Sequence, residues 1–275
     1  MANITASDVN NLRKQTGAGM MDCKNALVEA DGDYEKAVEI LRKKGQKVAA
    51  KRGDREANEG VVLAKSTGDK AAVIVLNCET DFVAKNEDFV KLAQTILDKA
   101  IENNPADLEA LKALNFNGDM SIADKIIEQT GVIGEKLDLS TYEVVSGALA
   151  VAYNHPGNKL ATIVAFNKAG DNIEEAGRQI AMQIAAMDPV AIDENGVAPE
   201  IIEREMAIGR EQALQEGKPE NIVDKIAEGK VKKFLKESTL LNQAFVRDNK
   251  ITVAQFLKQT ADGLEVTDFK RIMLG

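Results

Sequence analysis

The sequence predicts an α+β fold in which a helical N-terminal segment precedes a duplicated core of antiparallel strands and helices. Three observations predict it. Apolar residues recur at helical spacing through the first 45 residues. A continuously apolar run at residues 71–76 and a largely apolar run at 161–166 follow Gly60 and Gly147 in corresponding places, about ninety residues apart. Residues 199–237 then combine helical spacing with dense charge and no strand pattern.

The N-terminal segment predicts three short helices. Thr5 and Asp8 have the spacing of a capping box at the start of the first helix, and Asp33 offers an N-cap for the third. The basic pair before Gly45 is typical of a helix end, so we expect the third helix to stop there. These helices and a basic linker, helical or flexible, form a predicted UBA-like domain over residues 1–55.

Two copies of a hairpin followed by a helix form the predicted core. The unbroken apolar character of residues 71–76 predicts burial on both faces, and the strand at 160–166 is expected to be buried as well. A loop over residues 77–86 leads to a helix that starts near Glu87, and a second helix carries Ile173 to Ala185. The predicted strands cover residues 61–65, 71–76, 139–145, 147–152 and 160–166. The first half of the core is expected at 56–140, and the second at 141–188 with 238–275.

A helical hairpin is predicted as an insertion at residues 189–237. Pro199 stands just inside the start of one helix, and Gly217-Lys218-Pro219 separates it from the next. Each helix has one apolar face and a charged opposite face. The sequence leaves two interpretations of this hairpin open: its apolar faces pack only within the chain, or they form a homodimer interface.

Composition excludes several classes of protein. The chain has 35 Lys and Arg against 44 Asp and Glu among its 275 residues, a net charge of −9. Such an acidic protein repels nucleic-acid phosphates. One histidine and two distant cysteines, Cys23 and Cys78, disfavour a zinc site or a catalytic triad, so we expect inert, packed thiols. Residues 1–5 lack a secretory signal and no apolar run is long enough to span a bilayer, which predicts a cytoplasmic protein.

Three stretches carry a resemblance to a known family. They are TGAGMMDCK at residues 16–24, NCETDFVAK at 77–85 and EGKPE at 216–220. In this order, with a repeated core between them, they closely resemble the bacterial translation elongation factor Ts family. The resemblance implies a guanine-nucleotide exchange factor that binds elongation factor Tu and promotes GDP release without bond chemistry and without a cofactor of its own. It also implies that the hairpin is a dimerisation module.

The same resemblance assigns roles to individual residues. The tip that dislodges Mg²⁺ from the partner is implied to be Thr80, Asp81, Phe82 and Val83. Contacts with the partner are implied for Met20, Met21 and His155. The family often ends in an additional helix that packs on the partner. In this sequence a last strand is predicted around residues 264–273 and residues 269–275 close it, which puts that contact in doubt.

Ordinary structural roles explain the same residues without the resemblance. Phe82 after a strand is more often a core residue, and Asp81 more often an N-cap or turn residue. We expect at least one of Met20 and Met21 to face the helical bundle. His155 in Asn-His-Pro-Gly is most simply a turn residue.

Two other functional classes compete with nucleotide exchange. A chaperone-like binding module would use the same surfaces without altering nucleotide release. An enzyme is disfavoured because the sequence has no metal constellation, nucleophile elbow or glycine-rich cofactor loop. Residues 17–19, Gly-Ala-Gly, lack the Lys-Ser/Thr of a phosphate loop, so we expect no nucleotide binding by this chain.

Overall fold

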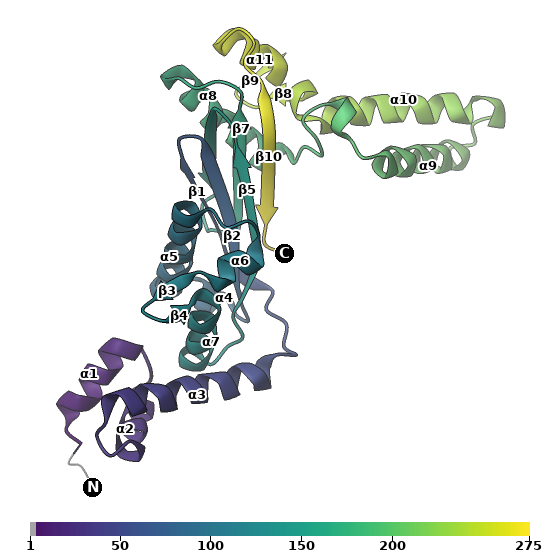
Figure 1. The fold of residues 1–275 in the computed structure, drawn as a ribbon. Helices are drawn as coiled ribbons and strands as arrows, with labels where there is room; N and C mark the ends of the chain where they lie inside the picture. The colour runs from purple at the N-terminus through teal and green to yellow at the C-terminus, as the bar shows by residue number, and fades with distance from the viewer. Residues whose placement is uncertain (1–3) are drawn as a thin grey trace. The chain divides into compact units, whose positions relative to one another are not determined.

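The computed structural model describes residues 4–275, and they confirm the predicted α+β class (Figure 1). The chain forms two compact units. The first holds the described residues up to Leu63 together with Val73–Glu143 and Met273–Gly275, and the second holds Ala64–Ala72 and Val144–Ile272. The finer division at 1–55, 56–140, 141–188 with 238–275, and 189–237 stays a prediction; residues 1–3 of it lie outside the described residues.

Three helices open the first unit: α1 (Ala6–Thr16), α2 (Met20–Glu29) and α3 (Tyr34–Arg52). Thr5 and Asp8 form the predicted capping box, and the Asp33 side chain accepts a hydrogen bond from the Lys36 amide to cap α3. Capping in this way satisfies backbone donors that a helix cannot pair internally. The bundle core is small and consists of Val9, Leu12, Ala18, Cys23, Ala26, Leu27, Ala30 and Ala37.

The predicted end of the third helix at Gly45 is wrong, because α3 continues to Arg52. Gly45 is buried and lies against α7 (Ile122–Ile133), with the backbone of Ile127 and Gly131 as neighbours. A Cβ on Gly131 would come under 3.0 Å from the Gly45 Cα. The glycine therefore serves a close helix crossing and does not end the helix.

The first core hairpin pairs β1 (Glu59–Thr67) with β2 (Lys70–Cys78), in a sheet of order β1-β2-β5 completed by β5 (Asp138–Ser146). Only Gly68-Asp69 connects the two strands, and Gly68 has φ +61°, which favours glycine. Residues 71–76 of β2 are all buried, as their unbroken apolar character predicts.

The loop predicted at residues 77–86 contains a four-residue helix, α4 (Asp81–Ala84). After it come α5 (Glu87–Asn103), which starts where it was predicted, and α6 (Leu108–Ala113). A small antiparallel ribbon of β3 (Asn115–Asn117) and β4 (Met120–Ser121) was not predicted, because strands of three and two residues carry no alternation to detect.

The second unit repeats the hairpin-and-helix arrangement. β6 (Leu149–Asn154) pairs antiparallel with β7 (Leu160–Phe166) in a sheet of order β10-β7-β6, and α8 (Asp171–Met187) packs on both strands. The second unit also contains the last residues of β5, two helices described below, and these further elements: η1 (Glu194–Gly196), η2 (Leu240–Asn242), β8 (Ala244–Phe245), β9 (Asp248–Thr252), α11 (Val253–Thr260) and most of β10 (Val266–Met273).

The glycines that suggested the repeat occupy equivalent environments. A Cβ on Gly147 would lie 2.5 Å from the Phe166 carbonyl oxygen, and one on Gly60 would lie under 3.0 Å from the Leu76 carbonyl oxygen. Each glycine thus faces the backbone at the end of the buried apolar run in its own copy. Close backbone approach leaves no room for a side chain at either place.

Helices α9 (Pro199–Gln215) and α10 (Glu220–Ser238) lie side by side as the predicted hairpin (Figure 1). Their seam is built from small residues: a Cβ on Gly209 would lie 3.0 Å from the Ala227 Cα. Ala213, Val223 and Val231 complete the buried side. Within residues 4–275, no helix combines the length and apolar character needed to cross a membrane.

Candidate functional site

The candidate site is the tip formed by α4, where an apolar ring faces solvent. The Phe82 side chain is 82% exposed, so the alternative of a core phenylalanine is wrong. Asp81 begins α4 and its carboxylate pairs with Lys85 at 2.6 Å. It caps neither helix here, because Thr80 is the N-cap of α4 and Asn86 that of α5.

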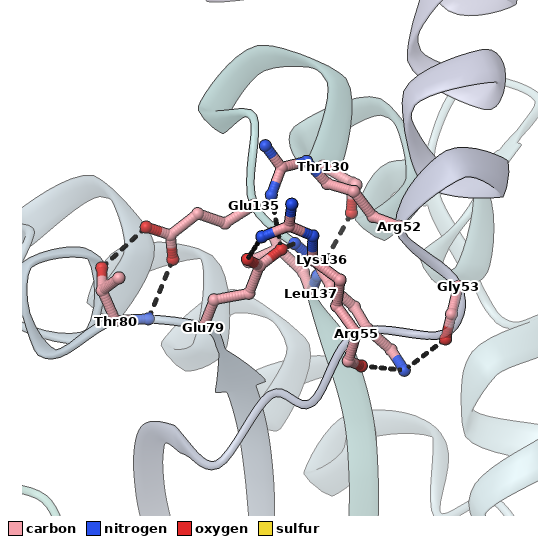
Figure 2. Close-up of polar contacts among 9 residues, drawn as sticks. All are labelled: Arg52, Gly53, Arg55, Glu79, Thr80, Thr130, Glu135, Lys136 and Leu137. Atoms are coloured by element: carbon pink, nitrogen blue, oxygen red, sulfur yellow. Dashed lines mark hydrogen bonds and ion pairs between the residues drawn. The ribbon is translucent and has the colours of Figure 1, made fainter.

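Thr80 holds the base of the tip. Its Oγ1 accepts a hydrogen bond from the Val83 amide at 3.4 Å, which caps α4. Both oxygens of the Glu135 carboxylate bind Thr80, one accepting from its amide at 3.0 Å and the other from its hydroxyl at 2.7 Å (Figure 2). Glu135 lies in the connection between α7 and β5, so a segment distant in the sequence holds Thr80 in place.

Glu79, next to Thr80, makes a second set of contacts beneath the tip (Figure 2). Its carboxylate accepts from the Lys136 amide at 2.6 Å and pairs with Arg52 at 2.7 Å and Arg55 at 3.4 Å. The Lys136 amide first, and then the Arg52 guanidinium, hold the pKa of Glu79 below its usual value. The end of α3 is thereby tied to the segment that carries Phe82.

Both cysteines are buried, as predicted. The Cys78 thiol donates to the Thr80 carbonyl oxygen at 3.1 Å, directly under the tip. Burial, and next the nearby Glu135 carboxylate, raise the pKa of Cys78 to about 12. A thiol in that state is a poor nucleophile, so Cys78 packs as an apolar side chain.

A groove of about 370 Å³ runs beside the tip. Val83 and Phe89 line it from the α4–α5 side, whereas Thr16 and Gly17 line it from the end of α1. The structure therefore brings the TGAG stretch and the TDFV stretch to one groove, although about 65 positions separate them in the sequence. Helix α7 contributes the remaining wall with Lys125, Gln129, Val132 and Ile133.

Met20 and Met21 begin α2, and both are exposed, at 56% and 62%. The expectation that one of them faces the bundle is wrong, because Cys23, Ala26 and Leu27 supply the buried face of this helix. The methionines line a separate groove of about 390 Å³ together with Ile4, Val9 and Lys24, among others. Flexible thioether side chains suit adaptable contacts.

His155 lies in the second unit, in the turn after β6, and is exposed. Its Nδ1 is 3.0 Å from the Tyr153 hydroxyl, and its amide donates to the Leu160 carbonyl oxygen. The prediction that His155 is a turn residue is thus confirmed. A role for His155 in binding stays a prediction.

The sequence did not reveal Arg52, Glu79, Glu135 and Lys136 as supports of the tip. No motif marks Glu135. It lies 55 residues from Thr80 in the sequence, and only the fold brings the two residues into hydrogen-bond contact. In the described part of the chain, no group of three or more His, Cys, Asp or Glu residues is placed to hold a metal ion.

Comparison with known proteins identifies the family. The family model described as elongation factor TS matches residues 79–275. Elongation factor Ts from Amoebophilus asiaticus is 52% identical over 275 residues, covering 99% of both chains. The protein of the same name from Porphyromonas gingivalis is 53% identical over 271 residues, covering 98% of both. That from Christiangramia forsetii is 50% identical over 277 residues, covering both completely.

An α+β chain with these full-length relatives is a translation elongation factor, with a role in protein biosynthesis. More narrowly, the chain belongs to the elongation factor Ts family. The family resemblance inferred from the three sequence stretches is therefore confirmed.

Proposed function

We propose that this chain is a guanine-nucleotide exchange factor that binds elongation factor Tu·GDP in the cytoplasm and promotes GDP release. The observation that carries the proposal is Phe82, an 82% exposed ring on the short helix α4. The N-cap residue of this helix, Thr80, is held by hydrogen bonds to Glu135. Exposing so large an apolar side chain has an unfavourable free energy in water, which docking into a partner would recover. Family membership supplies the partner.

Exchange by such a tip needs no bond chemistry. A factor that binds nucleotide-free elongation factor Tu more tightly than the GDP form must weaken GDP binding by the same factor. Bound Mg²⁺ bridges nucleotide phosphates and protein oxygens, so moving the elements that hold the ion lowers nucleotide affinity. Phe82 would act as the wedge that moves them, and Val83 would support it at the edge of the groove.

Asp81 adds a carboxylate beside that wedge. Lys85 pairs with it at 2.6 Å, and the Asp81 carboxylate raises the pKa of Lys85. Both groups are exposed enough to change partners on docking. We propose that Asp81 turns toward the water and side-chain network around the partner's Mg²⁺ or caps a partner helix.

Met20, Met21 and His155 are proposed as further contacts with elongation factor Tu. The two methionines present exposed apolar side chains at the start of α2, and the unbranched thioether suits adaptable contacts. A homodimer through residues 189–237 is a separate proposal. Its support is the partly exposed apolar surface of the hairpin at Ile208, Leu214 and Ile222.

The test is stopped-flow release of a fluorescent GDP analogue from elongation factor Tu at rising concentrations of this protein. Docking a phenylalanine side chain is worth about 1.5–3 kcal/mol, so Phe82→Ala should slow catalysed release at least about tenfold. Its unfolding midpoint should not change, because little of the ring is buried in the free protein. Val246→Ala, which trims a 47% exposed apolar side chain between β8 and β9, is the matched control and should keep full activity.

Each other outcome has a definite meaning. Acceleration that survives the Asp81→Ala/Phe82→Ala double variant would transfer the role of the tip to Met20, Met21 and the remaining contacts. Binding without acceleration would favour the chaperone-like module. Absence of binding would overturn the proposed partner.

A further inference from the structure

Directly beneath the tip, two chain segments are joined by two hydrogen bonds, each donated by a backbone amide of one segment to a carboxylate of the other. Glu79 accepts from the Lys136 amide at 2.6 Å, while Glu135 accepts from the Thr80 amide at 3.0 Å. Residues 79–80 thus supply one carboxylate acceptor and one amide donor, and residues 135–136 supply the same two groups in return (Figure 2). We call these four residues the reciprocal clamp.

Glu135 is the member of the clamp that acts on the tip itself. Its second oxygen accepts from the Thr80 hydroxyl at 2.7 Å, and that hydroxyl accepts from the Val83 amide at 3.4 Å. Donation to Glu135 points the hydroxyl proton away from Val83 and leaves the lone pairs for the cap. Glu135 therefore sets both the position of Thr80 and the orientation of its capping group.

Helix α4 needs an external support of this kind. A helix of four residues is far shorter than the roughly 12–15 residues that an isolated helix needs to be stable in water. Ala84 is its one buried residue, so packing holds only its far end. The direction of Phe82 consequently depends on how firmly Thr80 is held at the near end.

The other half of the clamp keeps Glu135 in place. The Lys136 Nζ donates to the carbonyl oxygens of Gly53 and Arg55, at 2.8 and 2.9 Å. Arg52 pairs with Glu79 at 2.7 Å. The end of α3 and the residues that follow it thus help to hold residues 135–136 in place.

We infer that Glu135 is a positioning residue for nucleotide exchange, acting through Thr80 to hold Phe82 in the orientation that docks. This inference rests on the proposed exchange function. A group that must reach its target in one geometry loses activity steeply when its support loosens. Glu135 itself contacts no partner in this account.

The first test measures the tip in the free protein. Hydrogen exchange of residues 81–86 should be faster in Glu135→Ala than in the parent, because the cap of α4 is loosened. Thr80→Val should reproduce the effect, whereas Thr80→Ser, which keeps the hydroxyl, should restore protection. Unchanged protection in Glu135→Ala would overturn the inference whether or not the protein is an exchange factor.

The second test is a double-mutant cycle on GDP release from elongation factor Tu at saturating protein. Glu135→Ala should lower the maximal release rate about tenfold. In a Phe82→Ala background the same change should have no further effect, because Glu135 acts through that ring. Additive losses would overturn the positioning role, since they indicate an independent contribution.

Two controls separate positioning from loss of fold and from failure of the exchange function. Glu109→Ala removes an exposed carboxylate that pairs with Lys112, and it should leave release unchanged. If Glu135→Ala does not fold, Glu135→Gln takes its place, since the amide keeps one acceptor for Thr80 and should show a smaller loss of the same kind. Acceleration by the parent with an unaffected Glu135→Gln would overturn this inference alone, whereas no acceleration by the parent would overturn the proposed function.

Discussion

Adding one methyl group at Gly131 should weaken the crossing between α3 and α7. The two helices meet through Gly45 and Gly131, and a Cβ on Gly131 would lie under 3.0 Å from the Gly45 Cα, closer than real Cβ contacts come. The obstructing atom belongs to the backbone, so no side-chain rotation relieves the overlap. The helices must move apart, and Val132, which packs against the core of the N-terminal bundle, must move with α7.

Two effects of opposite sign determine the magnitude. Glycine to alanine within a helix gains about 1 kcal/mol from helix propensity. Overpacking costs about 1–3 kcal/mol, and a rigid backbone neighbour places this site at the upper end. Gly131→Ala should therefore destabilise the crossing by about 1–2 kcal/mol. Gly229, an exposed position within α10 with nothing within 4 Å of its added Cβ, should show the propensity gain alone.

The assay combines urea unfolding, followed by circular dichroism, with hydrogen exchange of residues 34–52. Gly131→Ala should lower the midpoint and speed exchange in α3, because a local opening needs less free energy there. Gly229→Ala should raise the midpoint. Equal stabilisation by both substitutions would refute the reasoning, because it would mean that the crossing has room for a side chain.

Two further predictions concern the residues beneath the tip. The pKa of Glu79 is lowered by folding, so its stabilising contribution is present above its unfolded pKa of about 4.5 and is lost as pH falls through the folded value. Unfolding free energy should then fall more steeply from about pH 5 to pH 3 in the parent than in Glu79→Gln, which lacks that titration; parallel curves would contradict the assignment. Cys78, with its pKa raised to about 12, should have about one thiolate in 10⁴ at pH 8. Peptide mapping after iodoacetamide treatment should find Cys78 modified slowly in the native protein and quickly in urea, and equal rates would show that the thiol is accessible.

Much of the fold could be read from local sequence signals. The capping box at Thr5 and Asp8, the N-cap at Asp33 and the apolar runs at 71–76 and 161–166 all lie where they were predicted. These signals are local because caps join residues three apart and buried strands are continuous apolar segments. The candidate site was different: its residues could be named from the TDFV stretch, but not their exposure or their support.

The amino-acid sequence by itself determined the α+β class, the repeat marked by Gly60 and Gly147, and the family. Each of these can be recognised from the order and spacing of residue types along the chain. Only the tertiary structure decided that Gly45 continues a helix, that Phe82 faces solvent and that Glu135 holds Thr80. The physical reason is that each of these depends on a contact, or on the lack of cover, contributed by residues far away in the chain. Local propensity is a weak guide wherever such contacts determine the outcome.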